Sequence, residues 1–364
     1  MQFSLTEEHD QLASSARKLL ADTAGRMSPG DGIDRELLAT LGSLDLLGLS
    51  VDESLGGAGA GVLELAVLAE EIGAALPRVP FAASSVVSTL FLAAHTEPES
   101  QAVVRRLVDG SATSTTAWGT FPAGLNSGSR SALTLRLDHG GVTGEIPAVP
   151  FGADADYLLV FVHTEYGLAT ALADLSGHGV NRRSANGFDL SEPVATIVLD
   201  QAWPLFVGTP VCTATVVERV APGIFTALAA ELVGTGQRAL DNAVAYAKQR
   251  EQFGRVIGSF QAIKHLLADR HVQLDAARAL VHYAAWAADN GEPGAELAAR
   301  TALAAASEAA LAAAADNLQT HGGIGFTWEQ SAHRYLRRAR ARRSLLGSPA
   351  RQLDLVADHV LAPA

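Results

Sequence analysis

The sequence predicts an α+β fold that is mainly α: an N-terminal helical domain, a middle antiparallel β domain and a C-terminal four-helix bundle. Helical periodicity at both ends of the chain, and short strand-like runs rich in Thr, Ser, Val and Gly between them, are the observations that predict it. Long helices with short connections are typical of a bundle. We place the domains at residues 1–111, 112–215 and 216–364.

Composition excludes several classes of protein. The chain has 39 acidic residues against 27 Lys and Arg, a formal charge of −12, which disfavours nucleic acid as a partner because phosphate binding needs a positive surface. The single cysteine, Cys212, excludes an intrachain disulfide framework and a Cys-based zinc site, and suits the reducing cytoplasm. The longest apolar tract, 301–315, is shorter than the roughly 20 residues that cross a bilayer. We expect a cytoplasmic protein without metal or membrane partners.

The first domain is predicted from amphipathic periodicity. Ser4 and Glu7 have the spacing of a capping box, and the residues that follow place an apolar stripe on one helical face. The glycine-rich segment 56–61 lacks the preceding strand of a dinucleotide-binding fingerprint, so we expect a loop there. Further helices are predicted around 37–44, 62–75 and 82–108.

The second and third domains differ in their apolar period. Strands are predicted at 133–137, 157–162 and 196–199, with turn residues at 138–141 and 184–187. The bundle helices are predicted from Phe225 onward, along 263–281, in the alanine-rich tract and at 335–346.

The segment 249–261 is the first distinctive motif. We expect one helix to end near Gln252 and the next to begin near Ser259, with glycines allowing a sharp turn. Such a junction presents Arg250, Gln252 and Phe253 to an anionic planar ligand, because guanidinium binds phosphate and an aromatic ring packs on a flat one. The alternative is an ordinary surface turn with a buried phenylalanine.

The segment 319–327 is the second motif. It has three glycines, Gly322, Gly323 and Gly325, which allow a ligand to approach main-chain N–H groups closely. A helix C-cap followed by a turn is the alternative.

Together these two segments resemble the acyl-CoA dehydrogenase family. That family has an Arg-x-x-Phe-Gly turn followed by a Phe/His-Gln pair and, later, a Gln-x-x-Gly-Gly-x-Gly stretch. The loop 52–59 is similar to the family's Pro-Glu-x-x-Gly-Gly-x-Gly connection. The matching residues here are Arg250, Phe253, Gly254, Phe260, Gln261, Gln319, Gly322, Gly323 and Gly325.

The resemblance implies FAD as cofactor and α,β-dehydrogenation of an acyl-CoA thioester, with an electron-transfer flavoprotein as the oxidant of the flavin. It implies that Arg250, Gln252 and Phe253 contact the FAD of a neighbouring subunit, and that Gln319, Gly322 and Gly323 hold its ADP portion. Residues expected beside that flavin are Ile257, Phe260 and Gln261.

The chain departs from the family where the catalytic base belongs. Leu346 occupies the position of the usual glutamate, and leucine cannot abstract a proton. The alternative base position, near Ile224 and Phe225, is apolar too, and Glu231 lies about two helical turns beyond it, roughly 10 Å away. We expect Glu231 to be a structural or helix-surface acid. The segment 115–122 also lacks the family's Thr-Glu-Pro-x-x-Gly-Ser sequence, which holds the flavin ring.

One hypothesis accounts for these departures: a non-catalytic subunit of a heteromeric acyl-CoA dehydrogenase. The chain resembles the actinobacterial α2β2 enzymes that act on steroid side chains, with one FAD per heterodimer. Two alternatives remain: a self-sufficient homo-oligomer with a displaced base such as Glu231, and a non-enzymic assembly scaffold.

A run of arginines lies beside Leu346. No acid occurs from Ser331 through Leu353, which predicts a basic strip that is solvated, faces another subunit, or attracts CoA phosphates or an acidic partner. Its members are Arg334, Arg337, Arg338, Arg340, Arg342, Arg343 and Arg351.

Overall fold

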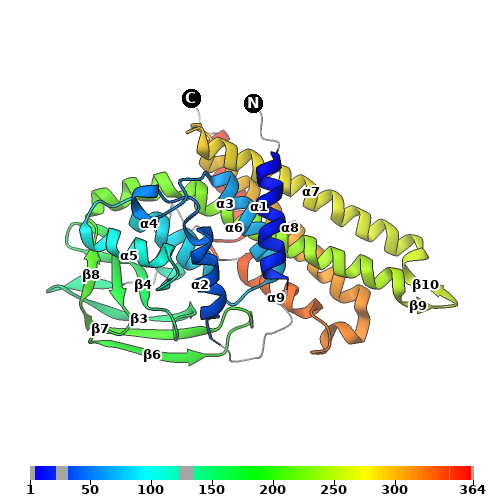
Figure 1. Ribbon diagram of the computed structural model, residues 1–364, viewed down its shortest axis with the longest axis horizontal. Coiled ribbons are helices and arrows are strands. Elements are labelled where there is room, and N and C mark those ends of the chain that lie inside the picture. Colours follow the sequence, from blue (N-terminus) through cyan, green and yellow to red (C-terminus); the bar gives the residue numbers. More distant parts are fainter. Residues whose placement is uncertain (1–4, 22–31, 123–134, 344, 362–364) are drawn as a thin grey trace.

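The computed structural model describes residues 5–21, 32–122, 135–343 and 345–361. It confirms the α+β fold, because helices from both ends of the chain pack beside a curled sheet formed by the middle (Figure 1). The N-terminal part contains α1 (Glu7–Leu20), α2 (Arg35–Ser43), α3 (Val62–Ala75), α4 (Thr89–Ala93) and α5 (Pro98–Val108), with 3₁₀ turns at Leu46–Gly48 and Glu53–Leu55 and a π-helix at Phe81–Ser88.

The sheet and the C-terminal helices follow in that order along the chain. The strands are β1 (Ser114–Thr116), β2 (Arg136–Asp138), β3 (Gly141–Pro150), β4 (Tyr157–Thr164), β5 (Gly167–Asp174), β6 (Val180–Ala185), β7 (Val194–Ala202) and β8 (Pro204–Val207). The C-terminal elements are α6 (Pro210–Gln249), β9 (Glu251–Gln252), β10 (Arg255–Val256), α7 (Gln261–Asp289), α8 (Ala295–His321), α9 (Ala332–Arg343) and α10 (Pro349–Val360). Further 3₁₀ turns lie at Trp118–Thr120, Ile257–Ser259 and Gly322–Phe326.

The first helix is capped by Thr6. The backbone N–H of Thr6 donates to Nδ1 of His9 at 3.0 Å. Because Nδ1 accepts this bond, Nε2 of His9 carries the proton and donates it to Glu64 of α3, also at 3.0 Å. The predicted Ser4 cap lies outside the described residues. The glycine-rich segment 56–61 forms the expected loop and leads into α3.

The strand order is β6-β7-β3-β2-β4-β5-β8, and β1 pairs with β4. The described pairs are antiparallel apart from two: β4 lies parallel to β1, and it meets β2 in a parallel bridge between Arg136 and His163. The pair of β4 with β5 is antiparallel. The predicted strands at 157–162 and 196–199 lie within β4 and β7. The predicted strand 133–137 overlaps β2, although its first two residues lie outside the described part of the chain.

Close backbone packing holds α6 against its neighbours. A Cβ added to Gly234 would lie 1.8 Å from the carbonyl oxygen of Glu70 in α3, and one added to Gly73 would lie 1.9 Å from that of Glu231 in α6. On another face of α6, a Cβ at Gly236 would lie 2.9 Å from Cα of Ala310 in α8. Glycine is therefore required at both helix crossings.

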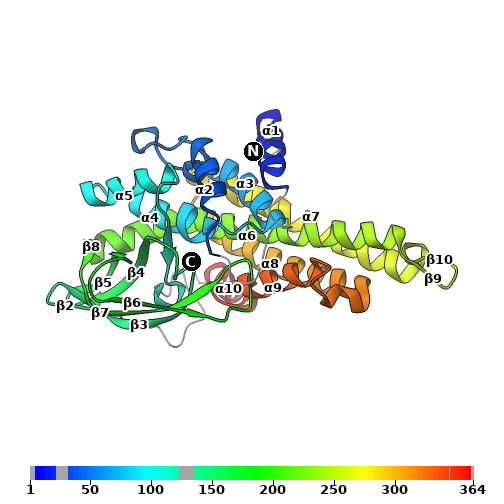
Figure 2. The ribbon, with the colours of Figure 1, turned by 60° about the horizontal axis from the view of Figure 1, so that its bottom comes forward.

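The C-terminal part of α6 and the N-terminal part of α7 form an arm that extends away from the β domain. In Figure 2 the two helices run side by side to the short β9–β10 hairpin at the far end. Helix α6 starts at Pro210, six residues before the predicted start of the C-terminal domain at residue 216. The predicted helix 335–346 corresponds to α9, which ends at Arg343. The additional helix α10 packs on α8.

Helix α8 is a core helix of the bundle. By length and composition the segment Ala295–Phe326 could cross a membrane, but 61% of its most apolar window is buried inside the protein. Alanine predominates here because small side chains permit the close approach to α6.

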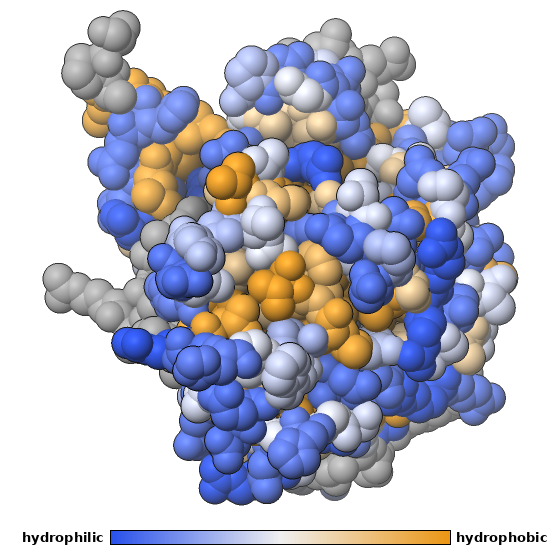
Figure 3. All heavy atoms as spheres, turned by 90° about the vertical axis from the view of Figure 1, so that its left-hand side faces the viewer, coloured by the Kyte–Doolittle hydropathy of each residue, from blue (hydrophilic) through white to orange (hydrophobic). Residues whose placement is uncertain are grey.

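Apolar side chains are exposed at the end of the molecule opposite the β9–β10 hairpin. Figure 3 views the side on which β8 and the start of α6 lie, and apolar side chains gather there between polar ones. In β8 and at the start of α6, the exposed large apolar side chains are Leu205, Val207 and Val211.

Candidate functional site

The first predicted motif forms the tip of the α6–α7 arm. Helix α6 ends at Gln249, and Arg250 caps it by donating its backbone N–H to the carbonyl of Tyr246 at 2.9 Å. Phe253 and Gly254 both have positive φ, 55° and 76°, so they are the central pair of a two-residue hairpin turn of the I′ class. The predicted junction is present, with a hairpin in place of a simple turn.

The tip presents aromatic and cationic groups outward. Phe253 is 93% exposed, and its ring meets that of Phe260 edge to face at 6.2 Å. The Arg255 guanidinium lies 4.1 Å from the centre of the Phe260 ring. Arg250, Gln252 and Gln261 are exposed too, whereas Ile257 and Phe260 are half-buried. The predicted alternative of a buried Phe253 is wrong.

The second predicted motif lies at the same end of the bundle. Gln319 is exposed near the end of α8, and Gly322 has φ 63°, a backbone conformation that favours glycine. A Cβ added at Gly322 or Gly323 would meet no described atom within 4 Å, so the main chain there is open to a ligand. The rings of Tyr246 in α6 and His321 in α8 stack with centroids 4.2 Å apart, which joins this segment to the arm.

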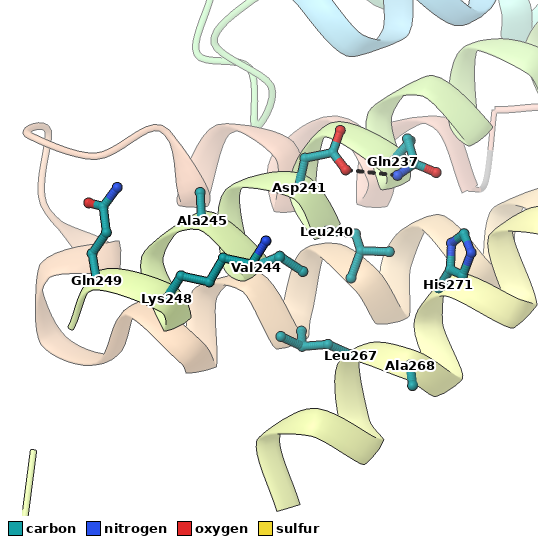
Figure 4. Close-up of a pocket in the computed structure, with 10 residues that line it drawn as sticks. All are labelled: Gln237, Leu240, Asp241, Val244, Ala245, Lys248, Gln249, Leu267, Ala268 and His271. Carbon is teal, nitrogen blue, oxygen red and sulfur yellow. Dashed lines mark hydrogen bonds between the residues drawn. The ribbon is translucent and has the colours of Figure 1, made fainter. Parts of the chain in front are cut away.

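A groove runs along the arm directly before the tip. Figure 4 shows the side chains of α6 and α7 that line it, and Gln237 donates a hydrogen bond to Asp241. The hollow has a volume of about 630 Å³, and the hydrogen bond is 2.9 Å long. Leu240, Val244 and Leu267 give it an apolar floor. Lys248 and Gln249 line it as well, so it reaches the residue that precedes Arg250.

Both positions where the family resemblance places a base belong to the buried core. Leu346 is 2% exposed, and its carbonyl accepts a hydrogen bond of 2.5 Å from the side chain of Gln352. Arg300 donates to the Gln352 side chain at 2.7 Å and lies 4.3 Å from the ring centre of Phe225. The two apolar positions, 346 and 224–225, are thus connected through Arg300, and sequence patterns gave no signal for this arrangement.

Glu231 lies in a buried ion network. Its Oε1 is 2.5 Å from Nη1 of Arg338 and 2.9 Å from Nε of Arg342. Burial acts to raise the pKa of Glu231, but the charges of Arg342 and Arg338 outweigh it and hold the pKa below the ordinary value. This carboxylate is a structural ion-pair partner of two arginines, and its accepting oxygen points at them.

Two further acids complete the network from the loop before β7. Asp189 lies 2.5 Å from Nε of Arg338, and Glu192 receives two hydrogen bonds from Arg342, at 2.6 and 2.8 Å. The network therefore fastens α9 to α6 and to the β domain.

The predicted basic strip is wrong for its central members. Arg338 and Arg342, one helical turn apart, face inward and are 2% and 5% exposed. Arg343 pairs with Glu308 at 2.5 Å, and Arg337 donates to the carbonyl of Phe188 at 3.1 Å. The acids that neutralise the buried pair come from distant parts of the chain, so the local charge pattern could not show them.

In the segment 115–122 each threonine hydroxyl already donates its proton to a backbone carbonyl. The hydroxyl of Thr115 donates to the carbonyl of Pro150, that of Thr116 donates to the carbonyl of Ala83 at 3.1 Å, and that of Thr120 donates to the carbonyl of Ala117 at 2.7 Å. All three threonines are buried. The Trp118 ring is buried as well and packs 5.2 Å from that of Phe121.

Comparison with known proteins identifies the family. Residues 6–111 match the N-terminal domain of acyl-CoA dehydrogenases and residues 226–361 match their C-terminal domain. The acyl-CoA dehydrogenase IpdE2 of Mycobacterium tuberculosis is 32% identical over 354 residues, covering 94% of each chain. This chain belongs to the acyl-CoA dehydrogenase family.

Other relatives within the acyl-CoA dehydrogenases agree. FadE34 of Mycobacterium tuberculosis is 36% identical over 88% of this chain, which spans only 42% of that longer protein. Among solved structures, a variant of the Tcur3481–Tcur3483 steroid ACAD has a TM-score of 0.84 at 29% identity, covering 97% of this chain and 98% of that one. A chain of the ChsE4–ChsE5 complex of Mycobacterium tuberculosis has a TM-score of 0.86 at 28% identity, and the match covers 100% of this chain and 100% of that one.

The cofactor of acyl-CoA dehydrogenases is FAD, and two described parts of this chain differ in how well they fit it. The arm tip is open and offers cations, an exposed ring and accessible glycine main chain. The segment 115–122 has its hydroxyls and rings committed to the protein core. Among the described residues, the groups that fit a flavin nucleotide therefore lie at the arm tip and at Gly322 and Gly323.

Proposed function

We propose that this chain is the non-catalytic subunit of a heteromeric acyl-CoA dehydrogenase and completes the FAD site of a homologous catalytic subunit. The observation that carries the proposal is a contrast within one chain. Arg250 and Phe253 point outward at the arm tip, while Leu346 fills the base position in the core.

The tip residues have chemically distinct parts in this proposal. The Arg250 guanidinium would bind a phosphate oxygen, with Gln252 as a neutral hydrogen-bonding neighbour. Phe253 would pack on a flat ring, and the main-chain N–H groups at Gly322 and Gly323 would approach the ADP portion. FAD, when bound, supplies the hydride acceptor for the β-hydrogen of the acyl-CoA. The carboxylate that takes the α-proton would come from the catalytic partner. In this chain the side chains at positions 346 and 224–225 are apolar and cannot accept a proton.

The arm also favours assembly with a homologous chain. Its apolar groove between α6 and α7 continues directly into the tip, so one partner can cover both. Val272 of α7 is 65% exposed, as expected of a surface that another subunit covers. The ChsE4–ChsE5 complex is a precedent for assembly from two different chains, and the Tcur3481–Tcur3483 steroid ACAD is a precedent for a steroid-type substrate. By analogy we propose an α2β2 assembly that acts on a bulky acyl-CoA.

Flavin stoichiometry tests the proposal. We expect the chain purified alone to lack FAD, and its complex with a homologous catalytic subunit to contain one FAD per two chains. Arg250→Ala in this chain should strip FAD from the complex, whereas Arg340→Ala, an exposed arginine of α9, should leave FAD bound. A yellow, active protein from this chain alone would refute the proposal. Full retention of FAD by the Arg250→Ala complex would favour an assembly scaffold.

The self-sufficient alternative needs Glu231 as a base. That carboxylate is 2% exposed between Arg338 and Arg342, and a lowered pKa makes it a weak proton acceptor. These contacts weigh against the role. If the chain purified alone shows turnover, and Glu231→Gln leaves that turnover unchanged at a temperature where the variant is folded, Glu231 is excluded as the base.

A further inference from the structure

The stacked rings of Tyr246 and His321 lie between the two segments that are proposed to contact FAD. Their planes are 24° apart with centroids separated by 4.2 Å, which is close to parallel stacking. Tyr246 is one helical turn before Arg250, and His321 directly precedes Gly322. No other ring contact described between α6 and α8 lies this close to both segments.

Contacts with the backbone tie each of the two residues to the segment beside it. The Tyr246 carbonyl accepts the Arg250 N–H at 2.9 Å, so a shift of the tyrosine moves the arm tip. Nδ1 of His321 lies 2.9 Å from the carbonyl of Asn317 and must carry a proton to donate there, which orients the imidazole along α8. A Cβ added at Gly325 would lie 3.0 Å from Cβ of His321, so the glycine segment folds back tightly on this residue.

The stack also bridges α6 and α8 beyond their close crossing at Gly236. At Gly236 and Ala310 the two backbones touch, and the helices continue beyond this contact toward the arm tip. Ten residues after Gly236, the Tyr246 ring of α6 meets the His321 ring of α8. A stacked aromatic pair fixes the distance between the two helices, because the rings are rigid and cannot approach each other more closely.

We infer that Tyr246 and His321 are positioning residues that set the distance between Arg250 and the Gly322–Gly323 main chain, and hence the affinity of the half-site for FAD. The inference rests on the proposed function, since it concerns the same flavin. Neither side chain needs to touch the cofactor to act in this way.

The experiment measures FAD affinity by flavin fluorescence titration of the reconstituted heteromeric complex. We expect Tyr246→Leu to weaken FAD binding about tenfold, which corresponds to ~1.4 kcal/mol and lies within the range of an aromatic pair. Tyr246→Phe keeps the stack and should bind FAD within about twofold of the parent complex. Combining Tyr246→Leu with His321→Leu should cost no more than either change alone, because both remove one interaction.

Two reference variants separate the possible failures. Arg250→Ala tests the half-site itself: if this variant leaves FAD binding unchanged, the proposed function fails, and the positioning role fails with it. Leu274→Ala, a fully buried bundle residue, should lower the melting temperature without weakening FAD binding. The positioning role alone is overturned if Arg250→Ala weakens FAD binding while Tyr246→Leu binds as tightly as Tyr246→Phe. It is also overturned if Leu274→Ala weakens FAD binding as much as Tyr246→Leu.

Discussion

Glu231 and Arg338 form an ion pair in the interior of the protein, with Oε1 and Nη1 2.5 Å apart and both side chains 2% exposed. The pair joins the middle of α6 to α9, and Asp189 extends it to the loop before β7. A charge left here without its partner would be buried and uncompensated.

We therefore expect Glu231→Gln to destabilise the protein by about 3–5 kcal/mol at neutral pH, the cost of breaking a buried pair. The matched control is Glu308→Gln, which breaks the exposed Arg343–Glu308 pair and should cost at most about 1 kcal/mol. Chemical denaturation of the isolated chain measures both. Equal, small effects would contradict the role assigned to the network.

The same pair predicts an acid dependence. The arginines hold the folded-state pKa of Glu231 below its ordinary value of 4.5, so its contribution to stability is complete above about pH 4.5 and is lost as the pH falls through the folded-state pKa. The difference in melting temperature between wild type and Glu231→Gln should be largest at neutral pH and shrink below pH 4.5. A difference that grows in acid would contradict this sign.

The crossing of α3 and α6 predicts a steric effect at Gly234. Its replacement by alanine would place a Cβ 1.8 Å from the Glu70 carbonyl oxygen, so the helices must separate, at a cost of about 1–3 kcal/mol or more. Gly323→Ala is the control, because the added Cβ would have open space around it. Thermal unfolding should show a lower melting temperature for Gly234→Ala only. Equal melting temperatures would mean that the crossing can relax without cost.

The exposed ring at the arm tip predicts a separation of binding from stability. Phe253→Ala removes a side chain that is 93% exposed, so the stability of the chain alone should change by less than about 0.5 kcal/mol. In the complex with a catalytic subunit, FAD binding should weaken by more than ~1 kcal/mol, as for an aromatic anchor at an interface. Tyr166→Ala, 81% exposed in the turn between β4 and β5, should change neither quantity. Undiminished FAD binding by Phe253→Ala would remove this ring from the half-site.

Restoring an acid at position 346 should not restore a catalyst. Leu346→Glu buries an unpaired carboxyl in the core and should lower the melting temperature, while Leu353→Glu, at a half-exposed site on α10, should not. Neither variant should retain FAD when purified alone, because the hydroxyls of Thr115 and Thr116 remain bound to backbone carbonyls. Absorbance of flavin in the purified variant tests this directly. A flavin-bound, active Leu346→Glu chain would show that only the base had been lost.

Local patterns in the sequence determined the class of fold and the nature of the arm tip. Helical periodicity and the strand-like runs are properties of neighbouring residues, and so are the turn at Gly254 and the open main chain at Gly322. Comparison with a family motif was enough to notice that Leu346 is not an acid.

The tertiary structure decided which groups are free and which are committed. The sequence predicted a basic strip that included Arg338 and Arg342, because their acidic partners are distant in the sequence. These partners, Asp189, Glu192 and Glu231, lie more than one hundred positions away along the chain. The stack of Tyr246 on His321 was equally hidden, since it needs α6 and α8 to run side by side. Charge neutralisation and ring stacking depend on distances in space, and only the packed helices and sheet set those distances.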